Sequence, residues 1–191
     1  STTGTVNFTP TNDSVYEGDE TATIAISSVS GGSATESGSQ SVTITISEDE
    51  SAPTVTLTVS ATSIAENAGS SLTITATLST ATTADVTVTI GTAGTATEGT
   101  DYTDGSGNLD DITISAGATT GTTTFTPTDD SMYETSTDET ATVAIDTVSG
   151  GSATENGTQS VTITINENES APTVTLATSA TSIAENAGSS I

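Results

Sequence analysis

Six short segments in which a small residue, mostly threonine, alternates with aliphatic residues constrain this fold more than any other feature, and a seventh, threonine-rich segment carries Phe125. Residues 54–59 read TVTLTV, and residues 161–165 read VTITI. Because successive side chains of a β-strand point to opposite faces, a period of two places the aliphatic residues on one face. We expect strands at residues 55–59, 72–78, 86–90, 112–114, 119–128, 141–145 and 161–165.

The residues between these segments are rich in Gly, Asn, Asp and Ser, which favour turns. About seven short strands with one apolar face each are typical of an antiparallel sandwich of two sheets, and the sequence shows no helical period. A net charge of −25 with 3% aromatic residues is also found in disordered chains. The recurring alternation favours order, so we predict an all-β, immunoglobulin-like β-sandwich.

The sequence repeats itself. TTGTVNFTPTNDSVYEGDE at Thr2 recurs as TTGTTTFTPTDDSMYETSTDE at Thr119. Pro10 recurs 117 positions later as Pro127, and Pro53 recurs 119 positions later as Pro172, so two residues are inserted in the second copy. We predict three units: residues 1–52 are the C-terminal part of one repeat, 53–171 a complete repeat, and 172–191 the start of the next. The chain would then be a segment of a longer tandem array.

The chain carries 25 acidic residues and no Lys, Arg or His, so its side chains cannot form ion pairs. Two carboxylates about 4 Å apart repel by roughly 4 kcal/mol at an effective dielectric constant near 20. Compaction therefore calls for external cations. Nucleic acid and anionic membrane surfaces are excluded as electrostatic partners because both are negative. No apolar run approaches the roughly 20 residues that span a bilayer.

Five carboxylates gather within residues 126–140. They are Asp129, Asp130, Glu134, Asp138 and Glu139. Calcium binds six to eight oxygens, mostly from carboxylates and carbonyls, whereas zinc and copper sites use the His and Cys that this chain lacks. We expect calcium to supply the missing positive charge; the alternative is that the cluster is solvated in a salty medium. Residues 104–110 (DGSGNLD) are either a second ion site or a turn.

Four stretches taken in order resemble the Calx-β domain, a calcium-binding sandwich. They are SIAENAGSS at residues 63–71, GTATEGTDYT at 94–103, DDSMYE followed by DET at 129–140, and NENES at 166–170. The preceding unit matches with NDSVYEGDE and SEDES. The resemblance implies calcium at one end of the sandwich, where loops and the C-terminal tail of each unit converge.

The resemblance also implies the ligands. In the complete unit they are Glu66, Asp101, Asp129, Asp130, Glu134 and Glu139, with Glu167 and Glu169 in the acidic tail. In the preceding unit they are Asp13, Glu17, Glu20, Glu48, Asp49 and Glu50. Asn12, Asn166 and Asn168 stand where the family pattern favours Asp, and the insertion at 135–137 alters the spacing between Glu134 and Glu139. We therefore expect fewer or weaker ions than in the best family members.

Near-identical tandem units favour a structural role. We expect a secreted or cell-surface module, an adhesin stalk or extracellular filament, stiffened by calcium near the junctions between units. Its partners would be neighbouring repeats, joined head to tail, and further chains that assemble into filaments. The alternative is a regulatory calcium sensor, the role that the resemblance to Calx-β domains of ion exchangers implies. We do not expect an enzyme, because a nucleophile would find no His or Lys as its base.

Overall fold

The computed structural model describes residues 2–134, 138–186 and 188. Within these ranges the chain forms strands, turns and loops and no helix, which confirms the predicted all-β fold. The described residues accordingly include no helix long and apolar enough to cross a membrane.

All the strands predicted for the complete unit are present in its described part. They are β4 (Thr54–Val59), β6 (Leu72–Leu78), β8 (Val86–Gly94), β10 (Ile112–Ile114), β11 (Thr120–Pro127), β12 (Glu139–Ser149) and β14 (Ser160–Asn166). The sequence did not predict the short strands β5 (Ser63–Ala65), β7 (Ala81–Thr82), β9 (Tyr102–Thr103) and β13 (Thr154–Glu155).

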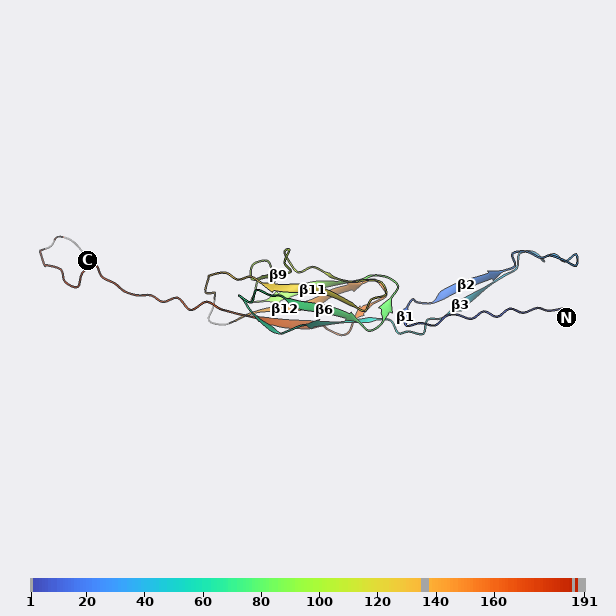
Figure 1. Ribbon diagram of the computed structural model, residues 1–191, viewed down its shortest axis with the longest axis horizontal. Coiled ribbons are helices and arrows are strands. Elements are labelled where there is room, and N and C mark those ends of the chain that lie inside the picture. The colour runs from blue at the N-terminus through green and yellow to red at the C-terminus, as the bar shows by residue number, and fades with distance from the viewer. Residues whose placement is uncertain (1, 135–137, 187, 189–191) are drawn as a thin grey trace.

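Two sheets face each other in the complete unit (Figure 1). Among the described residues, one has the order β10-β8-β12-β14-β5 and the other the order β13-β4-β6-β11-β9. Neighbouring strands are antiparallel except at the edges, where β5 lies parallel to β14 and β13 lies parallel to β4. Because Ala65 of β5 lies opposite Asn166 of β14, the chain leaves both strands at the same end of the sandwich.

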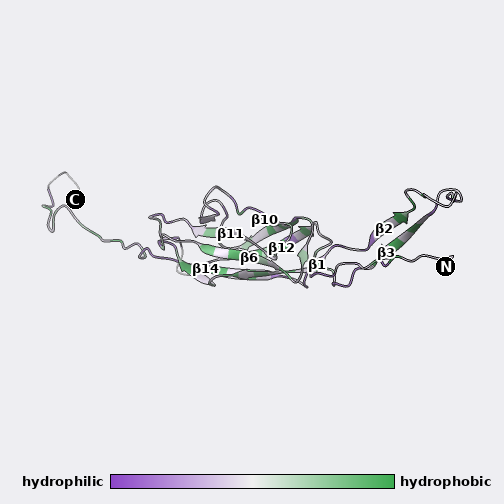
Figure 2. Ribbon diagram, turned by 45° about the vertical axis from the view of Figure 1, so that its right-hand side comes forward, coloured by the Kyte–Doolittle hydropathy of each residue, from purple (hydrophilic) through white to green (hydrophobic). Residues whose placement is uncertain are grey.

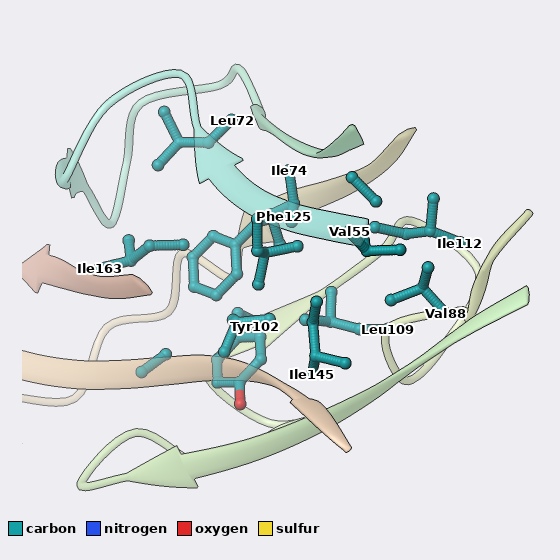
Figure 3. Close-up of a cluster of buried hydrophobic side chains, with 14 of the residues drawn as sticks. Val55, Leu72, Ile74, Val88, Tyr102, Leu109, Ile112, Phe125, Ile145 and Ile163 are labelled. Carbon is teal, nitrogen blue, oxygen red and sulfur yellow. The ribbon is translucent and has the colours of Figure 1, made fainter. Parts of the chain in front are cut away.

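The apolar faces of the two sheets meet in a core of aliphatic side chains, with two stacked aromatic rings among them (Figure 3). The rings belong to Tyr102 and Phe125, and their centroids lie 4.5 Å apart. Burying a large apolar side chain stabilises the fold by about 1.5–3 kcal/mol. Every buried hydrophobic residue in the described ranges lies between Val55 and Ile165, so the complete unit holds a core of its own.

The outward faces carry threonine, as the alternation predicts, and Figure 2 shows hydrophobic and hydrophilic residues alternating along the strands. Across β12 and β14 the hydroxyls of Thr142 and Thr162 lie 3.1 Å apart. A bulge in β12 between Ile145 and Thr147 breaks the period. The extra residue turns Val148 back toward the core, where it packs against the buried cluster.

The preceding unit contains β1 (Val15–Tyr16), β2 (Glu20–Ala25) and β3 (Ser41–Ile46). β2 and β3 are copies of β12 and β14, and they pair in the same register. Residues 2–11, the copy of β11, form no strand. Strand β6, which pairs with β11, has no copy in residues 1–52, and Phe8 is accordingly 42% exposed whereas Phe125 is 0% exposed.

Residues 172–191, predicted to begin a third unit, behave in the same way in their described part. Residues 173–178 copy β4 but form no strand. Leu176 is 101% exposed, whereas its copy Leu57 is 5% exposed. Threonine–aliphatic alternation therefore specifies which face is buried, and the strand forms where its neighbours in the sheet are present.

Candidate metal site

Acidic side chains converge at the end of the sandwich where β5 and β14 finish and β12 begins. Glu66 follows β5, Glu167 and Glu169 follow β14, and Glu139 is the first residue of β12. Asp101 lies immediately before β9. The ends of four strands therefore bring together residues that are far apart in the sequence.

One group, the Glu66 cluster, consists of Glu66, Glu167 and Glu169. Each offers a carboxylate oxygen, and these oxygens lie within 4.8 Å of one another. The parallel pairing of β5 with β14 positions them, and Glu66 N continues the pairing by donating to Asn166 O at 3.0 Å. Glu66 is only 6% exposed, which is rare for an ionisable residue without a cationic partner.

A second group, the Glu139 cluster, consists of Asp101, Glu134 and Glu139, whose carboxylate oxygens also lie within 4.8 Å of one another. Asp101 is held in place by Thr97 N, which donates to its Oδ2 at 2.5 Å. The insertion at 135–137 lies outside the described residues. The carboxylates on either side of it nevertheless meet, so the altered spacing does not separate them.

The two clusters form one continuous acidic end. The backbone of Asp130 partly offsets the rise in the pKa of Glu66, and the charges of Asp129 and Asp130 act on Glu169. All the residues that the resemblance implied for this unit are thus gathered here: Glu66, Asp101, Asp129, Asp130, Glu134, Glu139, Glu167 and Glu169. Their role as ligands stays a prediction.

The ionisation of these carboxylates is strongly perturbed. Burial raises the pKa of Glu66 to about 7. Burial, together with the neighbouring charge of Asp101, raises the pKa of Glu139 to about 7 and that of Glu134 as well. The backbone N–H groups of Glu169 and Glu134 instead lower the pKa of Glu167 to about 2. A cation placed here would favour the ionised form of every one of these groups.

Two buried carboxylate oxygens, Glu139 Oε2 and Glu169 Oε2, have no hydrogen-bond donor among the described residues. An unpaired buried acceptor costs about 1–3 kcal/mol, and more when it is charged. Carboxylates elsewhere do find donors: Asp85 Oδ1 accepts from Ala116 N at 2.8 Å, and Asp111 Oδ1 accepts from Ile90 N at 3.3 Å. The two unpaired oxygens distinguish these clusters from the other acidic loops.

Residues 104–110 form a turn. Asp104 Oδ1 accepts from Ser106 N at 2.7 Å and from Gly107 N at 2.9 Å. These bonds lower the pKa of Asp104. The hydrogen bond between Asp104 and Asp110 raises the pKa of Asp110. The Asp104 carboxylate therefore stabilises the loop, which favours the turn interpretation over a second ion site.

The preceding unit has an acidic cluster like those of the complete unit. This Glu48 cluster consists of Glu48, Asp49 and Glu50. Glu48 Oε2 accepts from Glu17 N at 2.5 Å, as Glu167 Oε2 accepts from Glu134 N at 3.0 Å. A cavity of about 310 Å³ is lined by all the residues implied for this unit: Asp13, Glu17, Glu20, Glu48, Asp49 and Glu50. Backbone hydrogen bonds lower the pKa of Glu48 to about 2. The hydrogen bond between Glu50 and Glu48 raises the pKa of Glu50 to about 7.

Asparagine side chains have a role that the sequence interpretation missed. Asn168 Nδ2 donates to Glu169 Oε1 at 2.9 Å. The amide of Asn12, turned so that its nitrogen faces Asp49, donates to Oδ1 at 3.1 Å. In a chain without cationic side chains these amides supply donors to carboxylates. In the sequence, Asn168 lies between Glu167 and Glu169 and Asn12 directly precedes Asp13, and this closeness to acidic residues could have indicated the role.

Comparison with known proteins identifies the family. The family model described as the Calx-beta domain matches residues 1–51 and 48–169. The chain belongs to the Calx-beta domain family. The solved structure of the apo form of the Calx CBD1 domain is similar at 17% identity and a TM-score of 0.47, and the match covers 62% of this chain and 99% of that one. No curated protein matched the chain. Calx-beta domains are calcium-binding β-sandwich modules.

The residues of the acidic end fit calcium. Calcium–oxygen distances are 2.3–2.6 Å, so two ligands of one ion lie at most about 5 Å apart, and the oxygens of each cluster lie within 4.8 Å of one another. Magnesium prefers a tighter octahedron at 2.0–2.1 Å. The donor set holds only oxygen, which suits a hard cation rather than zinc or copper.

Proposed function

We propose that this chain is a structural module of a secreted or cell-surface repeat protein, in which calcium bound at the acidic ends stiffens a head-to-tail array of sandwiches. The observation that carries the proposal is a pair of buried carboxylate oxygens, Glu139 Oε2 and Glu169 Oε2, that find no donor in the described part of a chain without a cationic side chain. At neutral pH and above, where these carboxylates ionise, such a site is stabilised by an external cation that supplies the missing positive charge.

The position of the clusters supports the structural role. The Glu48 cluster ends at Glu50, and the next unit begins at Pro53. Calcium bound there would join the end of one sandwich to the start of the next and limit bending at the junction. A stalk or filament needs many similar spacers, which near-identical repeats provide.

Calorimetric titration and thermal unfolding of the full chain test this function. Calcium should bind saturably, and at about 100 times its Kd it should stabilise each site by about 2.7 kcal/mol. The experiment uses fixed ionic strength, with magnesium as the matched divalent control. An equal response to magnesium, or no response to calcium, would contradict the proposal.

The alternative function is a regulatory calcium sensor, and one observation favours it. The short strand β1 lies between Asp13 and Glu17 and contacts the next unit, so the ion could change how two units are arranged. Calcium sensors bind with Kd values of about 10⁻⁷–10⁻⁵ M, and extracellular modules with about 10⁻⁴–10⁻³ M. The measured Kd therefore separates the two functions.

A further inference from the structure

The segment β1 belongs to the preceding unit but pairs with a strand of the complete unit. It lies parallel to β7, with Val15 opposite Ala81 and Tyr16 opposite Thr82. Figure 1 places β1 at the end of the sandwich, where β2 begins and β3 ends. Backbone pairing of this kind joins one module to another by strand addition.

The receiving strand β7 is held firmly by its own unit. Thr82 is 2% exposed, its carbonyl oxygen accepts from Gly117 N at 2.8 Å, and its hydroxyl donates to Ala84 O at 2.6 Å. Gly151 packs so closely that a Cβ there would lie 2.8 Å from Thr82 Oγ1. The edge is therefore preformed, and docking a strand on it costs little ordering entropy.

Carboxylates of the acidic loop shape the inserted strand. Asp13 Oδ1 accepts from Val15 N at 2.8 Å, and Glu48 Oε2 accepts from Gly18 N at 2.6 Å. These bonds flank β1 on both sides. The conformation that docks on β7 is consequently set within the preceding unit, by Asp13 in the loop and by Glu48 in the acidic tail after β3.

Residues 130–134 repeat this loop in the complete unit. Asp130 Oδ1 accepts from Met132 N at 2.6 Å, the same bond that Asp13 makes to Val15. Val15 is half-buried against β7, whereas its copy Met132 is 66% exposed. Residues 172–191 copy residues 53–72 and include no copy of β7. The loop thus shares the Asp130–Met132 bond with its copy and presents an exposed apolar side chain.

We propose that Met132–Tyr133 is a docking strand whose partner is the β7 edge of another unit of this same kind, the following one in an array. Each unit then presents a strand at its acidic end and a receiving edge at the other. The contact joins two different surfaces, the strand of one unit and the edge of the next. Such a head-to-tail contact can repeat along the array without forming a closed ring.

Disulfide trapping tests the proposal, because the chain has no Cys of its own. Residues 53–191 contain both complete sheets and the whole core, and they present Met132 together with a β7 edge that β1 no longer covers. In this fragment, M132C with A81C places the cysteines in register between molecules, within disulfide reach. M132C with T83C is the matched control, two residues out of register.

Mild oxidation in chelator should convert the M132C/A81C fragment into a ladder of disulfide-linked oligomers on non-reducing gels. The M132C/T83C fragment should stay monomeric, and so should M132C/A81C in the full chain, where Val15 covers Ala81. No ladder at high protein concentration, or equal ladders from both fragments, would overturn the proposal. Because calcium is not used, the outcome is independent of the calcium proposal.

Discussion

Glu66 and Glu185 occupy the same sequence, SIAENAG, yet the structure gives them different surroundings. Glu66 is 6% exposed within the acidic end, whereas Glu185 is exposed. The difference comes from β14 and its acidic tail, which pair with the segment around Glu66. The chemistry of a single carboxylate here depends on the strand beside it rather than on its own motif.

The pair provides a matched test. E66Q removes one charge from the Glu66 cluster, and E185Q removes the same charge from an exposed copy. We predict that E66Q weakens calcium binding at least about tenfold, or about 1.4 kcal/mol, and raises the unfolding midpoint in chelator by relieving repulsion. E185Q should change neither quantity in calorimetry and thermal unfolding. Equal effects from both variants would show that Glu66 is not a ligand.

The pH dependence of folding stability follows from two groups of pKa shifts in opposite directions. The pKa values of Glu66 and Glu139 rise from an ordinary 4.5 to about 7, so the folded chain binds more protons than the unfolded chain between these values. Stability in calcium-free buffer should therefore fall as the pH rises from 4.5 to 7, and then level off. The pKa of Glu167 falls to about 2, so stability should also fall as the pH drops from 4.5 toward 2.

The predicted profile of the unfolding midpoint has a maximum near pH 4.5 without calcium. Saturating calcium should remove the decline between pH 4.5 and 7, because the bound ion favours the carboxylates in their ionised form. Thermal scans from pH 2 to 9 measure both profiles. A calcium-free midpoint that rises from pH 4.5 to 7 would contradict the assignment of buried, unpaired carboxylates.

At the scale of elements, the long strands could be predicted because their period of two is sustained. Strands β5, β7, β9 and β13 are two or three residues long, too short to carry a period. Their pairing depends on tertiary contacts, such as the parallel contact of β5 with β14. The order of the motifs therefore indicated which carboxylates converge. It did not indicate that they form two clusters, or that Glu139 Oε2 and Glu169 Oε2 find no donor among the described residues.

A comparison of strand β11 with its copy at residues 2–11 shows how far the burial of an aromatic side chain depends on neighbouring strands. Phe125 is 0% exposed and stacks on Tyr102, whereas Phe8 is 42% exposed. We predict that F125A destabilises the chain by about 3–5 kcal/mol, the usual range for a buried Phe, and that F8A costs less than about 1 kcal/mol. Denaturant unfolding measures both. Similar losses would mean that residues 2–11 pack more tightly than the structure shows.

Gly94 links β8 to the acidic end. Its φ is +133°, and a Cβ there would overlap the carbonyl oxygen of Thr140, next to Glu139. We predict that G94A destabilises the fold by about 1–3 kcal/mol and also weakens calcium binding, because Thr140 must move.

G121A is the control for this prediction, since a Cβ at Gly121 overlaps the carbonyl oxygen of Thr113 in β10, away from the acidic clusters. G121A should lower stability without changing the calcium Kd. If both variants lose calcium affinity, the effect of G94A comes from general destabilisation of the fold and not from movement of Thr140.

At the scale of the whole molecule, the chain is elongated, with its two ends at opposite ends of the long axis (Figure 1). The acidic loop that holds Asp13 and Glu17 also carries β1, the segment paired with the next unit. An ion in that loop would therefore act on the contact between units. Calcium binding should therefore also stiffen the junction, because the same loop carries the carboxylates and β1.

Spin labels on S39C and S70C, one in the preceding unit and one in the complete unit, measure this coupling as a distance distribution. We predict a broad distribution in chelator and a narrow one in calcium, because ion binding orders the loop around β1. E50Q removes one carboxylate of the Glu48 cluster and should leave the distribution broad in calcium, whereas E185Q should not affect the narrowing. If the width is unchanged while calorimetry shows that calcium binds, the ion stabilises each unit separately and the junction is stiffened by strand pairing alone.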